Sequence, residues 1–386
     1  MMQKEIDIAM MARSLRLAER GLYTTSPNPR VGCVLVQAGQ IIAEGWHVRA
    51  GEPHAEINAI AASNGKTPGA TAYVTLEPCS YTGKTGPCCE ALIRAGVTRV
   101  VFAMEDPNPK VAGRGIECLR QAGIDVTGPL LEEQARELNP GFIKRMETGR
   151  PLVRCKLAMS LDGRTGMASG ESKWVTGPMA RRDVQRLRAR SCGIVTGIGS
   201  ILHDDPALTV REEELGLEQA AAVARRQPLR VVVDSQLRTP PGAKLLQGGG
   251  TVLIATVEPE EANGADEPIP SASARVAELR AKGAEVATMG AYGGQVALGA
   301  LLVELARREC NEILVEAGAD LAGAFLRAGL LDELIVYMAP KLMGSDARPL
   351  FTLPLQTMAA QLPLTITDIR AVGNDWRITA RPDPEG

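Results

Sequence analysis

The sequence has few aromatic residues and almost no excess of either charge. Aromatic side chains make up 3% of the 386 residues, and 43 basic residues stand against 45 acidic ones, for a formal net charge of −2. Proteins that bind nucleic acid usually carry a basic excess, and many stack bases on aromatic side chains. We therefore expect no nucleic-acid partner.

Long apolar runs and a dense cysteine pattern are also missing. A membrane-spanning helix needs about 20 consecutive apolar residues, and residues 1–20 mix apolar with charged positions as an amphipathic helix does, unlike a signal peptide. Eight cysteines are too few for a disulfide scaffold in a chain of this length. We expect a cytoplasmic protein without a membrane segment, whose cysteines are free thiols or metal ligands.

Glycine and proline, by contrast, are frequent, with 40 and 25 residues. They separate short apolar runs from helical stretches, and this alternation predicts an α/β protein. The length predicts more than one domain. A polar segment at residues 146–151 interrupts the alternation, so we expect one domain over residues 1–148 and a second over residues 149–386.

The periodicity predicts specific elements in each domain. In the first we expect a hairpin at 31–43, strands at 71–76, 99–103 and 124–127, and helices at 53–62, 89–95, 115–121 and 132–138. In the second we expect strands at 152–158, 193–196, 230–234, 252–256, 313–316 and 333–337, and helices near 179–189, 274–281, 298–308 and 321–328. Residues 212–227 and 258–273 are expected to be inserted surface loops.

Two motifs in the first domain contain residues suited to metal chemistry. His54 and Glu56 lie two positions apart, and Cys79 and Cys88 each follow a proline. One imidazole and two thiolates form a three-ligand zinc set that leaves a fourth position open for a water, which the metal acidifies. A carboxylate that does not bind the metal can then move protons to the leaving group. The sequence therefore predicts His54, Cys79 and Cys88 as zinc ligands and Glu56 as the catalytic acid–base.

The spacing within these motifs indicates where the side chains lie. Residues two apart do not share a helix face, so His54 and Glu56 can converge only at the first turn of a helix, where Pro53 is favoured. Pro87 has the same position before Cys88. Zinc nucleobase deaminases combine His-x-Glu with Pro-Cys-x-x-Cys. Here eight residues, 80–87, separate the two cysteines, and we expect them to shape the substrate pocket.

Ordinary packing is the alternative interpretation for the other cysteines and histidines, because cysteine is among the most buried residue types. His47 is expected to be structural and His203 to have no special role. The role of Cys89, beside Cys88, is left open. The thiols expected to be buried in packing are Cys33, Cys118, Cys155, Cys192 and Cys310.

Motifs along nearly the whole chain resemble the bifunctional riboflavin-biosynthesis deaminase/reductase family. The chain departs from the family at Ser200, where threonine is more usual, and in the insert at 258–273, and neither departure involves the zinc set. The matching segments are 25–29, 53–56, 75–80, 83–89 and 106–113 in the first half, and 160–163, 204–210, 315–318 and 339–344 in the second.

The resemblance implies a cytidine-deaminase-like zinc domain followed by a dihydrofolate-reductase-like domain. The first would hydrolytically deaminate a diaminopyrimidinone that bears a phosphoribosylamino group, and the second would use NADPH to reduce the ribosyl group to ribityl. Asn28 would by similarity hydrogen-bond the pyrimidine, although a residue between two prolines is also typical of a turn. The resemblance further implies a homo-oligomer with an even number of subunits.

The residues of the second domain give only a weak cofactor signal by themselves. Gly197 and Gly199 follow a strand, but the third glycine of a dinucleotide-binding motif is absent. The turn at 316–323, where a strand leads into a helix, is a better anion site, although an ordinary turn has the same pattern. By resemblance, the residues that contact NADPH are Ala158, Trp174, Ser200, Asp204, Ser235, Gly318, Ala319, Asp320, Leu321, Ala322, Gly323 and Ala324.

The resemblance also implies a substrate site in the second domain. Arg188 and Arg211 suit the 5′-phosphate, since arginine binds phosphate through two parallel hydrogen bonds, although either could be an exposed surface charge. We hypothesise that Lys156 and Glu316 orient the opened sugar for hydride transfer. The implied substrate residues of this domain are Lys156, Ser172, Arg188, Leu208, Arg211 and Glu316.

Two other classes of protein remain as alternatives. A tRNA deaminase uses the same zinc chemistry, but the near-neutral charge and the reductase-like second half argue against it. A non-enzymatic zinc protein would need four protein ligands, whereas the motifs supply three and would leave Glu56 without a role. NADPH and NADH are not distinguished by the residues alone.

Overall fold

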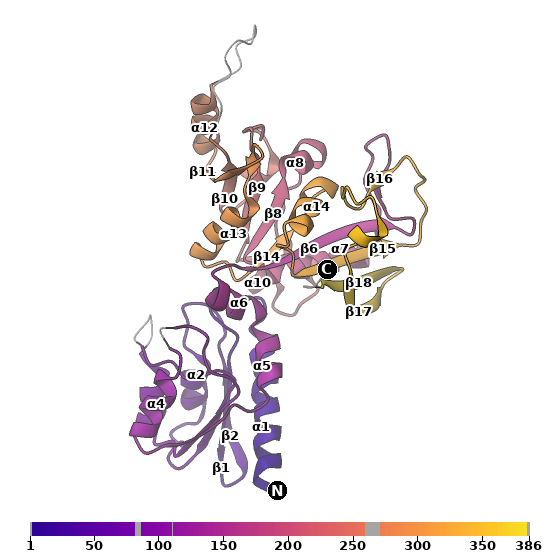
Figure 1. Cartoon of the computed structure of the whole chain (residues 1–386). Helices are drawn as coiled ribbons and strands as arrows, with labels where there is room; N and C mark the ends of the chain where they lie inside the picture. The colour runs from indigo at the N-terminus through magenta and orange to yellow at the C-terminus, as the bar shows by residue number, and fades with distance from the viewer. Residues whose placement is uncertain (1, 82–85, 110, 259–270, 384–386) are drawn as a thin grey trace. The chain divides into compact units, whose positions relative to one another are not determined.

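The computed structural model describes residues 2–81, 86–109, 111–258 and 271–383. The chain divides into two compact units, Met1–Arg150 and Pro151–Gly386, and each is described by itself (Figure 1). Sequence analysis placed the domain boundary between residues 148 and 149. Within the described ranges, no helix combines the length and apolar character that a membrane crossing requires.

The first unit is built on a five-stranded sheet with the order β2-β1-β3-β4-β5. β1 pairs antiparallel with both β2 and β3, while β3, β4 and β5 are parallel. The turn of the predicted hairpin contains Ala38 and Gly39, both with positive φ, and the hairpin is confirmed. The strands are β1 (Gly32–Gln37), β2 (Gln40–Trp46), β3 (Thr71–Val74), β4 (Arg99–Phe102) and β5 (Asp125–Thr127).

Helices cover both faces of this sheet (Figure 1). Strand side chains alternate between faces, so Val34 and Val36 pack with α1, α5 and α6, whereas Cys33 and Leu35 pack with α2, α3 and α4. Helix α6 was not predicted. The helices are α1 (Met2–Glu19), α2 (Ala55–Ala62), α3 (Cys88–Arg94), α4 (Arg114–Gln121), α5 (Glu132–Leu138) and α6 (Pro140–Thr148).

A buried ion pair attaches α1 to the sheet. Arg99 donates through Nη1 and Nη2 to the two carboxylate oxygens of Asp7 at 2.8 and 2.9 Å, and the Tyr73 hydroxyl donates to Oδ1 at 2.7 Å. The hydrogen bonds from Arg99 lower the pKa of Asp7 from 3.8 to about 2, although burial opposes the shift. Because the folded-state pKa is depressed, this contribution to stability is present above pH 4 and is lost as the pH falls toward 2.

We expect Asp7→Asn to lower the free energy of unfolding of the first unit by about 2 kcal/mol at neutral pH. Denaturant unfolding at neutral pH and at pH 3 would measure both the loss and its acid dependence. Asp125→Asn is the matched control, because Asp125 also contacts Arg99, at 3.4 Å, but its side chain is 69% exposed and should matter little. Equal losses for the two variants would contradict the prediction.

The second unit contains a nine-stranded sheet with the order β11-β10-β9-β8-β14-β6-β15-β18-β17. The strands from β11 to β15 are parallel, and the hairpin of β17 and β18 continues the sheet antiparallel. The strands are β6 (Leu152–Ser160), β8 (Gly193–Gly197), β9 (Leu229–Val233), β10 (Val252–Thr256), β11 (Ala284–Thr288), β14 (Glu312–Val315), β15 (Glu333–Ala339), β17 (Leu364–Val372) and β18 (Asp375–Pro382). Two short pairs lie outside this sheet: β7 (Arg164–Gly166) with β16 (Arg348–Pro349), and β12 (Ala291–Tyr292) with β13 (Gln295–Val296).

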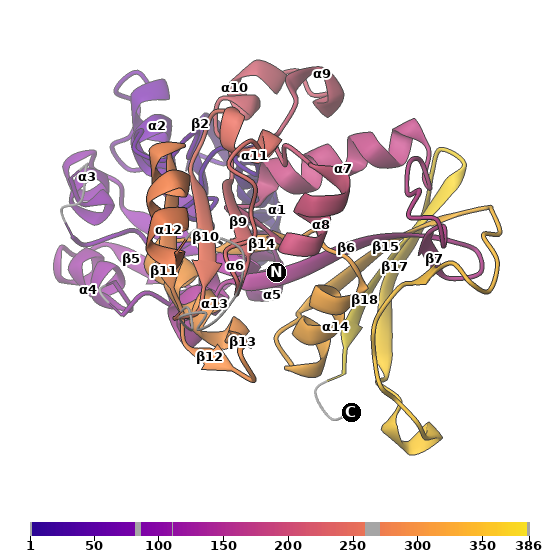
Figure 2. The ribbon, with the colours of Figure 1, turned by 90° about the horizontal axis from the view of Figure 1, so that it is seen from above.

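Helices again cover both faces (Figure 2). α13 and α14 pack on the face that contains Cys155 and Val315, and α7 packs on the other face against Leu314 and Tyr337. α8 and α12 also cover this second face, over β9 and β10. The helices are α7 (Pro178–Arg190), α8 (Ile198–Asp204), α9 (Glu212–Leu215), α10 (Ala220–Ala224), α11 (Lys244–Gln247), α12 (Ala272–Ala281), α13 (Leu298–Arg307) and α14 (Ala319–Arg327).

One predicted surface loop is wrong. Residues 212–227 contain the short helices α9 and α10, which bury Leu215 and Val223. These helices are only four and five residues long, too short for a recognisable helical period, and each buries a single apolar residue. Of the other predicted loop, residues 259–270 lie outside the described residues. Also not predicted were α8, α11, β11, β17 and β18, and the two short pairs β7–β16 and β12–β13.

Candidate functional site

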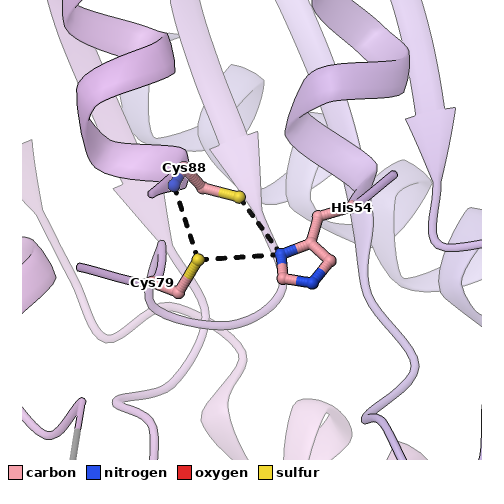
Figure 3. Close-up of side chains that lie close together, drawn as sticks. All are labelled: His54, Cys79 and Cys88. Atoms are coloured by element: carbon pink, nitrogen blue, oxygen red, sulfur yellow. Dashed lines mark hydrogen bonds between the residues drawn. The ribbon is translucent and has the colours of Figure 1, made fainter. Parts of the chain in front are cut away.

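The three predicted zinc ligands meet in the first unit (Figure 3). The Nδ1 atom of His54 lies 3.3 Å from the Cys88 sulfur and 3.6 Å from the Cys79 sulfur. All three ligand atoms lie within 4.8 Å of one another. A tetrahedral zinc ion with bonds of about 2.0–2.3 Å separates its nitrogen and sulfur ligands by about 3.5 Å. The donor set and its spacing therefore fit zinc.

The ends of two helices bring these ligands together. α2 begins at Ala55, two residues later than predicted, so His54 is its N-cap residue and Pro53 lies outside the helix. Pro87 is likewise the N-cap of α3, and Cys88 is its first residue. The positive ends of both helix dipoles thus lie at the site, where they favour thiolates.

Cys79 lies after β3 and is held by hydrogen bonds from the start of α3. Its sulfur accepts from the backbone N–H of Cys88 at 3.4 Å, and its carbonyl accepts from the N–H of Cys89 at 3.2 Å. The thiol of Cys88 and the ring of His54 lower the pKa of Cys79 to about 4, against the effect of burial. Cys79 is therefore prepared to bind a metal as a thiolate.

Glu56 occupies the first turn of α2, and only 3% of its surface is exposed. Burial, together with the nearby Cys79, raises the pKa of Glu56 from 4.5 to about 7. A group that both takes up and releases a proton works best when its pKa is close to the working pH. The carboxylate does not belong to the three-ligand group, so Glu56 is suited to proton transfer.

His47, which the sequence indicated as structural, also belongs to this site. Its ring lies edge-on to that of His54, with centroids 5.3 Å apart. The Nδ1 atom lies 3.1 Å from the Pro53 carbonyl, which can only accept, so Nδ1 carries the proton and Nε2 accepts from the Asn28 amide at 3.1 Å. Burial lowers the pKa of His47 and favours this neutral form. The bond directs the amide NH₂ of Asn28 toward His47 and leaves its Oδ1 to accept from a ligand.

In the second unit the structure brings together Lys156, Arg188 and Glu316. Arg188 donates through Nε and Nη2 to the Glu316 carboxylate at 2.6 and 3.0 Å. Cys155 pairs with Val315 between the parallel strands β6 and β14. The next residues, Lys156 and Glu316, are therefore neighbours on the opposite face of the sheet, which α7 covers. Burial would raise the pKa of Glu316, but Arg188 and Lys156 lower it. Burial lowers the pKa of Lys156.

The two arginines expected at the substrate phosphate differ in their surroundings. The guanidinium of Arg188 is already bonded to Glu316 and also donates to the Thr209 carbonyl at 3.1 Å, so its main effect is to orient Glu316. Arg211 is 45% exposed and pairs with Glu214 at 2.8 Å. Its charge still lowers the pKa of Glu316, which makes Arg211 the better of the two phosphate candidates.

Several of the predicted cofactor residues follow β8 and β14, two adjacent strands of the nine-stranded sheet. The chain continues from β8 to its neighbour β9, and from β14 to β15 on the opposite side. Ligands of open α/β sheets bind at such a topological switch point, beyond the carboxyl ends of the strands. α8, with Ser200 and Asp204, begins after β8, and α14 begins after β14.

The start of α14 offers an open backbone surface. Its N-cap, Gly318, has no side chain, and a Cβ added there would meet nothing within 4 Å. The first N–H groups of the helix are therefore accessible to an anion such as a cofactor phosphate. The later residues of the predicted segment 318–324 are less accessible. Ala322 and Gly323 are buried, and a Cβ on Gly323 would lie 2.5 Å from the Thr352 carbonyl.

The remaining predicted residues lie on other segments of the second unit. Ser172 donates to the Asp204 carboxylate at 3.0 Å, so a predicted substrate residue adjoins a predicted cofactor residue. Ser235 follows β9 and accepts from the Val296 N–H at 3.0 Å. Trp174 is exposed and lies under the Arg181 guanidinium, 4.4 Å from its ring centroid. Ala158 is half-buried on β6, and Leu208 is buried with a positive φ.

Known protein families match both units. The model described as the RibD C-terminal domain matches residues 151–378, and the cytidine and deoxycytidylate deaminase zinc-binding region matches residues 4–104. Riboflavin biosynthesis protein RibD of Escherichia coli K12 is 51% identical over 369 residues, which cover 95% of this chain and 96% of that protein. The corresponding protein of Haemophilus influenzae is 45% identical over 380 residues and 97% of both chains.

Solved structures show the same likeness over the whole length. Acinetobacter baumannii RibD superposes with a TM-score of 0.88 at 42% identity and covers 98% of this chain and 99% of that one. A Thermotoga maritima deaminase/reductase gives a TM-score of 0.81 at 30% identity, over 99% of this chain and 100% of that one. The predicted fold class, a deaminase-like zinc domain followed by a dihydrofolate-reductase-like domain, is thereby confirmed. The chain belongs to the RibD family of bifunctional deaminase/reductases of riboflavin biosynthesis.

Proposed function

We propose that this chain catalyses two successive steps on one small molecule. The first is hydrolytic deamination of 2,5-diamino-6-(5-phosphoribosylamino)pyrimidin-4(3H)-one, and the second is NADPH-dependent reduction of the product to 5-amino-6-(5-phosphoribitylamino)uracil. The Thermotoga maritima relative is named for this pair of activities. The observation that carries the proposal is the three-ligand group of His54, Cys79 and Cys88 beside the buried carboxylate of Glu56.

In the deamination step, zinc held by the three ligands would supply an acidified water as the nucleophile. Glu56 takes a proton from that water and delivers protons to the ring and to the departing amine, which leaves as ammonia while the ring carbon becomes a carbonyl. Asn28 binds the pyrimidine through its Oδ1 atom, since His47 engages its NH₂ group. The helix N-termini at the site stabilise negative charge as it develops.

In the reduction step, NADPH bound at the β8–β14 switch point would supply a hydride to C1 of the opened sugar. Lys156 provides the accompanying proton or hydrogen bond, and Glu316 orients the sugar. Arg188 keeps Glu316 ionised and in place through two parallel hydrogen bonds. Arg211 binds the 5′-phosphate. We propose the cytoplasm as the location of both steps, because the thiolate ligands must stay reduced.

We also propose a homo-oligomer, in which two copies of β17 pair. β17 is the edge strand of the nine-stranded sheet and exposes Ile366 and Ile369, each more than half accessible. Exposed apolar edge strands pair readily with other strands. Antiparallel pairing about Ile369 would place Asp368 of each copy opposite Arg370 of the other. Light scattering measures the oligomeric state of the native chain and of Ile369→Lys. A native chain that is monomeric would contradict this proposal.

Ammonia release from the phosphoribosylaminopyrimidine, without NADPH, tests the first step on zinc-loaded protein of measured metal content. NADPH oxidation on the isolated product tests the second. Ammonia release followed by NADPH consumption supports both assignments. If the zinc-loaded protein releases no ammonia, the pyrimidine assignment is wrong, and deamination of tRNA then tests the alternative class.

A further inference from the structure

Glu77 is a buried carboxylate that takes no part in the reactions described above. Its side chain is 3% exposed and accepts four backbone hydrogen bonds. Oε2 accepts from the N–H groups of Asp106 and Gly113 at 3.2 and 2.9 Å, and Oε1 accepts from Gly115 and Ile116 at 2.8 and 3.3 Å. Each oxygen is therefore committed to two donors.

These bonds join the turn that carries Cys79 to the start of α4. Gly113 is the N-cap of α4 and has no side chain with which to cap it, so the carboxylate of Glu77 satisfies the first N–H groups of the helix instead. The fit is close, because a Cβ added to Gly115 would lie 1.8 Å from the Pro78 carbonyl. Glu77 and Pro78, the two residues before Cys79, thus lie directly against this helix end.

Cys79 is accordingly held from two sides. α3 holds its sulfur and carbonyl through the N–H groups of Cys88 and Cys89, and α4 holds the preceding residues through Glu77. The other two ligands, His54 and Cys88, lie at the beginnings of helices, whereas Cys79 lies on an irregular segment whose position depends on these attachments.

We propose that Glu77 is a positioning residue of the metal centre, which fixes Cys79 by attaching its turn to α4. The inference rests on the proposed ligand set. In Glu77→Gln one carboxylate oxygen becomes an NH₂ group. This group faces two backbone N–H donors and cannot accept a hydrogen bond from either of them. The amide is displaced, and the Cys79 sulfur moves away from its place beside His54 Nδ1.

The full-length Glu77→Gln variant tests this inference through metal affinity. We expect its affinity for zinc, measured by competition with a chromophoric chelator, to fall by about 10–100-fold. Loaded with cobalt, it should show a weaker thiolate-to-metal absorption band than the native chain. The kcat for ammonia release should fall, while NADPH oxidation on the deaminated substrate stays native and shows that the second unit is intact.

Glu117→Gln is the matched control. Glu117 is exposed on the same helix, where its side chain accepts a hydrogen bond from Gln121 at 2.8 Å. We expect native zinc affinity and native ammonia release. Gly115→Ala tests the same attachment without changing any charge, because the added Cβ must push α4 away from Pro78, and it should weaken zinc binding in the same direction as Glu77→Gln.

Three results would overturn the inference. Zinc affinity and cobalt absorption of Glu77→Gln equal to those of Glu117→Gln would show that Cys79 needs no such attachment. Loss of the near-ultraviolet circular dichroism of the first unit even at saturating zinc would show that Glu77 serves folding and not positioning. Native affinity in Gly115→Ala would contradict it as well. A native chain that binds no zinc would instead refute the proposed ligand set itself.

Discussion

Glu56→Gln is expected to bind zinc as tightly as the native chain and to release ammonia about a thousandfold more slowly. The amide keeps the shape of the side chain in the first turn of α2, but it can neither take a proton from the attacking water nor deliver one to the departing amine. The three ligands His54, Cys79 and Cys88 are unchanged. Ammonia release and zinc content, measured on the same preparations, separate loss of chemistry from loss of metal.

Two comparisons make this experiment specific. Glu52→Gln changes a glutamate four positions earlier that is 48% exposed and only loosely paired with Arg49, at 3.7 Å, and it should retain native ammonia release. NADPH oxidation on the deaminated substrate should be native in both variants. If zinc-loaded Glu56→Gln deaminates within tenfold of the native rate, another group moves the protons and the assignment of Glu56 is wrong.

The second large effect is expected at Lys156. Lys156→Ala should lower the kcat for NADPH oxidation by about 100-fold or more, because we propose the half-buried side chain beside Glu316 as the proton or hydrogen-bond donor at the opened sugar. Ammonia release should be unaffected. Steady-state kinetics on the deaminated substrate separate kcat from KM. A rise in KM alone would assign Lys156 to binding only, and full turnover would remove it from the mechanism.

The same residue predicts a pH dependence. Burial lowers the pKa of Lys156 below its ordinary value of 10.5, with Arg188 acting in the same direction and Glu316 opposing. Because the charged form is the proposed donor, reductase activity should fall as the pH rises through this lowered pKa. Lys156→Ala should lack that alkaline decline, while Lys282→Ala, which changes an exposed lysine of the same unit, should keep it.

The sequence predicted best those features that depend on neighbouring residues. Helix α5 has the predicted bounds, and the hairpin predicted at 31–43 forms with its turn at Ala38 and Gly39. The proposed zinc ligands could also be identified from local patterns, since short motifs place His54 and Cys88 at the starts of helices. Even the small error at Pro53, which precedes α2 instead of beginning it, leaves the ligand positions unchanged.

Features that depend on contacts between residues far apart in the sequence could not be predicted. The helical spacing of Ile8, Met11 and Leu15 predicts that Ile8 lies on the buried side of α1, yet Ile8 is 37% exposed. Asp7 is buried instead, because Tyr73 and Arg99 supply partners from strands 66 and 92 residues away. His47 and Glu77 likewise gain their roles from partners that no local pattern indicates. β17 is exposed along almost its whole length, so it lacks the alternation by which a half-buried strand is identified.

The position of β6 determines the order in which the second unit can form during synthesis. β6 is the first strand of that unit to leave the ribosome, yet its neighbours in the sheet are β14 and β15, which begin at Glu312 and Glu333. Its apolar residues Val153, Cys155 and Leu157 therefore stay unpaired until strands about 160 to 180 residues later have been synthesised. The zinc ligands, in contrast, are all translated by Cys88. A nascent chain thus holds a complete metal-ligand set long before its reductase half can close.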